Sequence, residues 1–257
     1  MKPISIRHMI FGGVILALSG TTQASVSYNL TGWDDSGTGG LDGSAPASWT
    51  GTSAPNYTGA LNAMWFANLE SDNASETVSS LSARSQGADP NFALAVGPRA
   101  WSANATGTLG KGHGSDFGLI TLTSATNLTV TVSADTDLGS VLKPGFSLFQ
   151  GWDTSTTAVR VADYQNNQDN PLLSQGLDFI DSAASTIAGG FASFTFNNLG
   201  AGNYTLFVGG NATLSAGSQG KYTVALAASP VPVPGAVWLF GTAFFGAVGI
   251  GKAKRGN

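Results

Sequence analysis

The sequence predicts an all-β protein whose body is an antiparallel β-sandwich or jelly roll, preceded by a signal peptide and followed by a C-terminal transmembrane helix. Composition is the first reason: 35 glycines and abundant Ser, Thr and Asn favour turns, while only two glutamates in 257 residues leave helix formers scarce. The second is a series of short segments in which apolar and polar residues alternate, as in strands that bury one face. The third is that two apolar ends flank a polar middle.

The N-terminus has the features of a secretory signal peptide in their usual order. Lys2 and Arg7 precede an apolar stretch over residues 9–18, and small residues near position 24 match the positions that a signal peptidase reads. We therefore expect signal peptidase to cleave after Ala24, so that residues 1–24 are lost and the rest is exported.

The body, residues 25–229, is expected to be one domain with strands along its whole length. Its first part is rich in turns and is expected to hold short irregular strands, together with apolar stretches at 63–69 and 92–96. Several short strands joined by glycine-rich turns favour two antiparallel sheets packed face to face. The clearest predicted strands cover residues 117–122, 128–132, 145–152, 158–161, 191–196, 204–208 and 222–226.

One turn in the second half of the body carries a resemblance to a known family. The run Leu199-Gly-Ala-Gly-Asn-Tyr-Thr-Leu206 is similar to the last hairpin of bacterial pre-peptidase C-terminal-type domains, in which a Leu-x-Ala-Gly-x-Tyr turn leads into the final strands. The resemblance implies a jelly roll over about residues 128–228.

The C-terminal segment, residues 230–257, combines a proline pair, an apolar run and a basic cluster. Residues 235–251 carry no charge, and as a helix they would span roughly 25 Å, close to the thickness of a bilayer's hydrocarbon core. The cations after this helix are expected to stay on the cytoplasmic side, and the prolines to hold the chain extended outside the membrane. The residues expected to form the sorting and processing motif of this tail are Val231, Pro232, Val233, Pro234, Trp238, Lys252, Lys254 and Arg255.

This tail resembles the PEP-CTERM sorting signal of Gram-negative bacteria, in a variant with Pro232-Val-Pro234 in place of Pro-Glu-Pro and with Trp238 inside Ala-Val-Trp-Leu-Phe-Gly. The resemblance implies that an exosortase-type membrane enzyme removes or exchanges the tail as the protein moves from the inner membrane to the cell surface. It also implies an association with exopolysaccharide and biofilm formation. A permanently retained membrane anchor is the alternative.

The body is acidic and lacks cysteine. Five of the eleven cations lie in the two ends, so six cations face fifteen acids in the body, a formal charge of −9. Because nucleic acids are bound mainly through Lys and Arg at phosphates, this balance argues against nucleic acid as a partner. The absence of cysteine excludes disulfides and thiolate metal sites.

Aspartates in the loops after predicted strands are the candidate metal ligands. Asp135 and Asp137 form an Asp-x-Asp pair, and Asp153 lies in a later loop. Carboxylate oxygens from loops suit Ca²⁺, and an extended Asp-x-Asp places two carboxylates on one side. The pattern indicates either a calcium site formed by Asp135, Asp137 and Asp153 or turn-forming, solubilising aspartates.

The sequence gives little support for catalysis. His113, the one histidine of the body, lies between two glycines in an expected loop, which argues against a Ser-His-Asp triad and against a zinc site. Glu70 and Glu76 offer paired carboxylates for glycoside chemistry, but they lie in a polar run that is expected to be a loop. A surface carbohydrate-active enzyme, either a glycoside hydrolase or a lyase, is therefore the alternative to a non-enzymatic protein.

Tryptophans are the candidate sugar-binding residues, because an exposed indole ring can stack on a pyranose. Trp152 is expected to be buried, since it continues the alternation of Phe146 and Leu148. The tryptophans of the body are Trp33, Trp49, Trp65, Trp101 and Trp152.

Taken together, the residues predict an exported, non-enzymatic surface or matrix protein with exopolysaccharide as its expected partner.

Overall fold

A computed structural model describes most of the body of the protein. Residues 1–24, with the predicted cleavage site Ala24, and residues 233–257, with the predicted transmembrane helix 235–251, lie outside the described residues. No helix within the described part is long and apolar enough to cross a membrane. The described residues are 25–30, 49–53, 55–102, 110–111, 114–157, 163–212 and 219–232.

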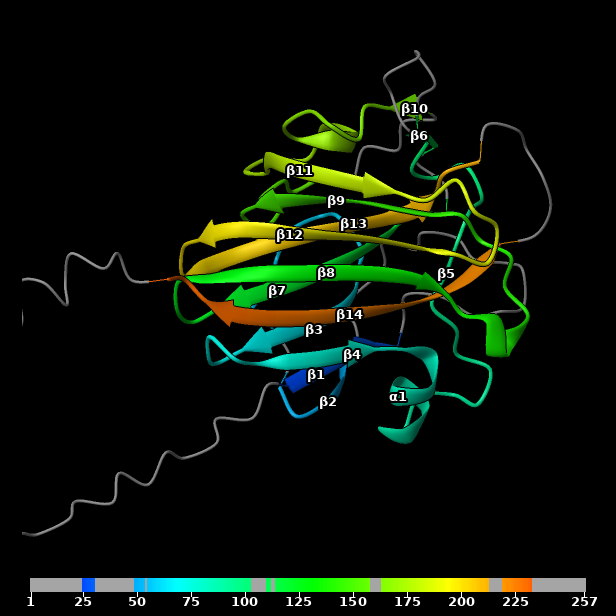
Figure 1. Cartoon of the computed structure of the whole chain (residues 1–257), viewed down its shortest axis with the longest axis horizontal. Coiled ribbons are helices and arrows are strands. Elements are labelled where there is room, and N and C mark those ends of the chain that lie inside the picture. The colour runs from blue at the N-terminus through cyan, green and yellow to red at the C-terminus, as the bar shows by residue number, and fades with distance from the viewer. Residues whose placement is uncertain are drawn as a thin grey trace, which may run out of the picture.

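The described chain forms two β-sheets packed face to face, so the predicted all-β sandwich is confirmed (Figure 1). The first sheet has seven strands in the order β11-β9-β13-β7-β3-β1-β2. Its strands are β1 (Ser25–Asn29), β2 (Trp49–Gly51), β3 (Ala63–Leu69), β7 (Asp116–Leu122), β9 (Pro144–Gln150), β11 (Asp178–Ala184) and β13 (Gly202–Gly210).

The second sheet has the strand order β12-β8-β14-β4, and β5 also pairs with β14. A single α-helix, α1 (Ser80–Ser85), follows β4 in the described chain, and two short 3₁₀ helices, η2 (Thr136–Leu138) and η3 (Pro171–Leu173), lie in loops. The strands of this sheet are β4 (Ser75–Val78), β5 (Ala95–Val96), β8 (Thr126–Ala134), β12 (Phe191–Leu199) and β14 (Gly220–Pro230). A separate small pair joins β6 (Gly110–Lys111) to β10 (Asp163–Tyr164).

The prediction that every strand pair is antiparallel is wrong at one place, because β3 and β7 pair in parallel. The other pairs of described strands are antiparallel. After β3 the chain crosses to the second sheet through β4, α1 and β5, then returns to the first sheet beside β3. A parallel pair requires a long crossover of this kind, whereas the other neighbours can be joined by shorter connections.

The main hydrophobic core lies between the two sheets. In β8 the side chains of Leu128, Val130 and Val132 are buried and alternate with partly exposed polar residues, as the sequence pattern predicts. They belong to the same buried cluster as Tyr204 and Leu206 of β13 in the first sheet. The alternating strands therefore bury the faces that their sequences indicate.

The start of β1 and the end of β14 lie at the same end of the sandwich (Figure 1, left). The strand registers agree with the picture. Ser25, at the start of β1, pairs with Asn68 near the end of β3. Ala227, near the end of β14, pairs with Ser75 at the start of β4, and β4 follows β3 after only a few residues. Both described termini therefore leave the body in one region.

Candidate functional site

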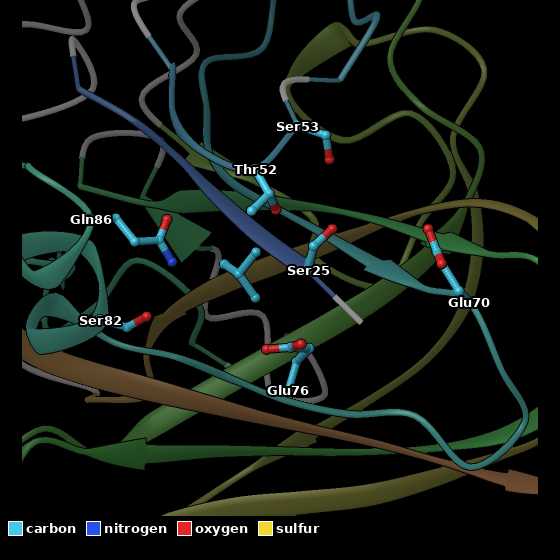
Figure 2. Close-up of a pocket in the computed structure, with 8 residues that line it drawn as sticks. Ser25, Thr52, Ser53, Glu70, Glu76, Ser82 and Gln86 are labelled. Carbon is cyan, nitrogen blue, oxygen red and sulfur yellow. The ribbon is translucent and has the colours of Figure 1, made fainter. Parts of the chain in front are cut away.

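A pocket of about 560 Å³ opens at the edge of the sandwich, where β1 and β2 of the first sheet approach β4 and α1 of the second (Figure 2). The strand order creates this opening, because β4 is an edge strand and reaches only part of the way along the first sheet. Polar side chains dominate the lining. The lining residues are Ser25, Val26, Thr52, Ser53, Glu70, Glu76, Ser82 and Gln86.

Both glutamates of the chain line this pocket, although they come from different elements. The expectation that they share one polar loop is wrong: Glu70 directly follows β3, whereas Glu76 lies on β4, two positions before the buried Val78. Successive side chains of a strand alternate between its faces, so Glu76 and Val78 face inward together. The sandwich edge therefore holds an inward-facing carboxylate.

The two carboxylates have different surroundings. Burial raises the pKa of Glu76 above its usual value, and a hydrogen bond from the Thr77 backbone opposes this shift. Glu70 is exposed, and its Oε1 accepts a hydrogen bond from the Asn68 side-chain amide at 2.9 Å. A pocket with one partly desolvated acid and one solvated carboxylate can bind a cation or exchange protons.

Gln86 closes the side of the pocket nearest the helix. It is the C-cap of α1, and its backbone N–H donates to carbonyls of the last helical turn, including Ser82 and Ala83. Its carbonyl accepts a hydrogen bond from the Thr50 hydroxyl, which ties the helix to β2. Ser79 is the N-cap of the helix, and its hydroxyl accepts from the Ser82 N–H at 3.0 Å. These contacts fix the short helix against the strand edge.

The structure does not bring the predicted calcium ligands together. Asp135 is the N-cap of η2 and accepts a hydrogen bond from the Leu138 N–H, while Asp137 is an exposed residue of the same 3₁₀ turn. Asp153 is buried, far along the chain. Across the described residues, no three His, Asp or Glu side chains are grouped so that they could hold a metal ion. The predicted grouping is therefore not formed.

Asp153 has a structural role that the sequence does not indicate. Its Oδ2 accepts hydrogen bonds from the Leu61 N–H at 2.9 Å and the Ser155 hydroxyl at 2.7 Å. Its Oδ1 accepts from the N–H groups of Ser155 and Gln175, both at 3.0 Å. One carboxylate therefore joins three loop segments, and its oxygens are already occupied by these donors.

The tryptophans divide into buried and partly exposed groups. Trp65 is fully buried between the sheets, and Trp101 is buried with its Nε1 donating to the Ser147 hydroxyl at 2.9 Å. Trp33, like His113, lies outside the described residues. Trp49 and Trp152 are partly exposed on the outer face of the first sheet. Only this last pair presents ring surface to solvent among the described tryptophans.

The expectation that Trp152 is buried with Phe146 and Leu148 is wrong. Gly151 takes a positive φ of 96° after β9, which ends the strand alternation and turns Trp152 to the outer face. There the Trp152 ring meets Tyr57 and Phe66 edge-on, with ring centroids 6.1 Å and 5.9 Å away. We call Trp49, Tyr57, Phe66 and Trp152 the outer aromatic cluster.

A row of polar side chains lies beside the outer aromatic cluster. Asn68, Thr121 and Asn203 are paired neighbours on β3, β7 and β13. Asn68 is two positions after Phe66 on β3, so the two share the outer face of that strand. The hydroxyl of Thr121 donates to the side-chain oxygen of Asn203 at 3.0 Å. Aromatic rings and hydrogen-bonding groups are therefore adjacent on one surface.

A buried polar network joins the two sheets at a point that the sequence does not reveal. The Tyr222 hydroxyl of β14 donates to Oδ2 of Asp116 on β7 at 2.7 Å. The same hydroxyl accepts a hydrogen bond from Trp65 Nε1 at 3.3 Å. Burial raises the pKa of Asp116 to about 7, and the hydrogen bond from Tyr222 opposes the shift. The Asp116 carboxyl is therefore an internal group of the sandwich.

Comparison with known proteins gives only distant structural likenesses. No model of a known protein family matches the chain, and no curated protein matches it in sequence. The surface-associated copper-binding protein CorA of Methylomicrobium album BG8 is 15% identical with a TM-score of 0.37, over 56% of this chain and 96% of that one. The secreted protein MopE of Methylococcus capsulatus, in which an oxidized tryptophan facilitates copper binding, is 12% identical with a TM-score of 0.39, over 79% and 94%.

A pre-peptidase C-terminal domain also resembles the structure weakly. The domain belongs to a collagenase from Bacillus anthracis, is 14% identical with a TM-score of 0.30, and is matched over 68% of this chain and 99% of that chain. At these identities and TM-scores, the likenesses carry no argument about function.

Proposed function

We propose that this chain is an exported, non-enzymatic protein of the cell surface or extracellular matrix that binds polysaccharide. Its leader is removed by signal peptidase, and an exosortase-type enzyme processes the PEP-CTERM-like tail while the precursor is held in the inner membrane. The observation that carries the binding proposal is the outer aromatic cluster, with partly exposed rings of Trp49, Tyr57 and Trp152 beside a polar row on one sheet face. The proposal includes no calcium ion at Asp153, because the Asp153 carboxylate already accepts four hydrogen bonds from protein donors.

The outer aromatic cluster has the chemistry that sugar recognition needs. A pyranose presents an apolar face that stacks on an aromatic ring and a rim of hydroxyls that needs hydrogen-bonding partners. Trp152 is held in place because its Nε1 donates to the Tyr204 carbonyl at 3.1 Å and its ring packs on Phe66. A ring fixed before binding loses little conformational freedom when a ligand arrives. Asn68 and Asn203 supply amide groups for the hydroxyl rim.

Affinity electrophoresis tests this proposal with the chain 25–257 in mild detergent and gels that contain alginate, xanthan or dextran. We expect at least one polysaccharide to retard the protein and Trp152→Ala to abolish the retardation. Phe191→Ala is the matched control, because Phe191 is an aromatic residue that is 65% exposed on β12 of the other sheet. Retardation that survives Trp152→Ala, or none on any gel, would contradict binding through this face.

A carbohydrate-active enzyme is the second candidate, and the pocket with Glu70 and Glu76 favours it. One half-buried acid and one solvated carboxylate is the asymmetry that glycoside hydrolysis uses for its general acid and its base or nucleophile. Release of reducing ends from the same polysaccharides, lost in Glu76→Gln, would support the enzyme. Binding without any release supports the non-enzymatic protein.

A further inference from the structure

The pocket of Figure 2 holds a carboxylate that has no cation beside it. Glu76 faces inward from β4 and is partly buried, and the described lining residues include no Lys or Arg. A carboxylate withdrawn from water is costly unless it is paired with a positive charge or is well hydrogen-bonded. Only the Thr77 backbone opposes the effect of burial on Glu76. The pocket is therefore suited to a cation that the described side chains do not supply.

The first residue of the described chain lies at this place. Ser25 starts β1 and lines the pocket together with Glu70 and Glu76 (Figure 2). Its register partner on β3 is Asn68, whose side-chain amide donates to Glu70. β1 pairs with β3 from Ser25 onward and with β2 only from Ser27 onward, so the position of Ser25 is fixed by the ladder with β3.

We propose that the pocket binds the protein's own N-terminal ammonium group, which exists only after the leader is removed. The inference rests on the proposed export with cleavage after Ala24. Hydrolysis adds one water across the Ala24–Ser25 peptide bond, so that Ala24 leaves as a carboxylate and Ser25 keeps the amino group. That amine takes a proton at neutral pH, because an α-amino group has a pKa of about 7.7–8.0. The uncut chain has an uncharged amide at the same atom.

The consequence is that processing stabilises the product. The new ammonium group pairs with the inward carboxylate of Glu76, in a pocket that Glu70 also lines. A metal ion is a poorer occupant, because two carboxylates give too few ligands and the described residues form no group of three. The start of β1 is thereby held in the sheet once the leader has gone.

Thermal unfolding of two forms of the chain 25–257 tests the inference. One form has a free amine at Ser25, and the other is acetylated there, which removes the charge and leaves the fold unchanged. At pH 7 we expect the acetylated form to melt about 2–4 °C lower, a shift of the size that one lost interaction gives a domain of this length. Glu76→Gln should remove the difference, whereas Asp178→Asn, at an exposed acid on β11, should keep it.

The pH dependence of that difference has a defined sign. Glu70 and Glu76 are the titratable side chains among the described lining residues. Pairing raises the pKa of the amine, so its contribution is lost as the pH rises above about 8. Burial raises the pKa of the Glu76 carboxyl, so the carboxylate that the pair needs is lost as the pH falls into the acidic range. The difference in melting temperature should therefore be largest near neutral pH and should shrink on both sides of it.

Two outcomes would overturn the inference. The first is equal melting temperatures at pH 7; the second is a difference that persists in the Glu76→Gln, Glu70→Gln double variant. A second readout is the pH dependence of acylation of the Ser25 amine, whose midpoint should lie above about 8 in the parent and return to the ordinary value in Glu76→Gln. Mass spectrometry of the exported protein shows separately whether the chain starts at Ser25. Polysaccharide retardation is tested at Trp152, which does not line the pocket, so failure of either proposal is distinguishable.

Discussion

At the scale of single residues, the buried triplet of Trp65, Tyr222 and Asp116 shows what local sequence cannot predict. Asp116 stands one residue before the predicted strand 117–122 and, from its neighbours alone, looks like a solvent-facing turn residue. The structure extends the strand by that residue and places the carboxyl against a tyrosine from a strand 106 positions later in the chain. The network depends on contacts across the core, which no local pattern records.

The raised pKa of Asp116 makes stability depend on pH. The pKa of Asp116 is about 7 in the folded protein, against an ordinary value of 3.8, so the stabilising contribution is complete below pH 4 and is lost as the pH rises to about 7. At 1.36 kcal/mol for each pKa unit, the free energy of unfolding should fall by at most about 4 kcal/mol across this window. Urea unfolding at pH 4.5 and pH 7.5, followed by tryptophan fluorescence, measures the change.

Asp116→Asn is the informative variant for this prediction, because an amide does not ionise and still accepts a hydrogen bond from Tyr222. We expect most of the pH dependence between pH 4 and pH 7 to disappear in Asp116→Asn and to remain in Asp178→Asn. A smaller slope of the same sign should persist, because burial also raises the pKa of Glu76. A parent protein with equal stability at both pH values would refute the assignment.

At the scale of elements, strands with a clean alternation could be predicted, and the polar edge strands β4 and β11 could not. β8 and β14 follow their alternating patterns closely, whereas β13 is buried on both faces from Tyr204 onward. β4 and β11 are missed because the first carries an inward glutamate, and the second contains two aspartates and a register shift between Phe179 and Asp181. The predicted strand 158–161 lies outside the described residues. Side chains on edge strands are partly solvated, so the hydrophobic signal is weak there.

The loop that carries Asp153 gives a prediction at this scale. Asp153→Ala leaves the buried N–H of Ser155 and the partly buried N–H of Leu61 without their partner, and each unsatisfied buried donor costs about 1–3 kcal/mol. We expect the free energy of unfolding to fall by about 3 kcal/mol, with an intermediate loss for Asp153→Asn, which keeps one acceptor oxygen. Urea denaturation measures both. Asp137→Asn, at an exposed acid of η2, is the control and should change little.

The same loop can be tested for a bound calcium ion, which would contradict a purely structural role of Asp153. If Asp153 serves the loops alone, EDTA and added Ca²⁺ should leave the melting temperature of the parent unchanged. A melting temperature that rises with Ca²⁺ and loses this rise in Asp153→Asn would instead place a metal ion at the loop. The sequence suggested the ion because it records the aspartate but not the four protein donors that surround its carboxylate.

At the scale of the whole molecule, the sandwich places the start of β1 and the end of β14 at the same end (Figure 1). The two predicted membrane-directed segments therefore extend from one region of the body, and the outer aromatic cluster lies on a sheet face. Composition and alternation were sufficient to predict the sandwich. The pocket was not predictable, because it is formed where strands from two sheets meet at an edge.

The last prediction concerns the tail, residues 230–257, which we propose is processed by an exosortase-type enzyme. Because proline lacks a backbone N–H and restricts the residue before it, we expect Pro232 and Pro234 to hold the chain extended. Replacing both with alanine should let the expected helix at 235–251 continue toward the body and should remove the extended segment that a protease cleft would bind. We expect processing to slow by at least about tenfold, the effect of each 1.36 kcal/mol added to a barrier. Mass spectrometry of the C-terminus after membrane fractionation should then find the uncut chain in the inner membrane. Uncut parent protein in the cytosol, or unchanged processing of the double variant, would show that the tail is not a sorting signal of this kind.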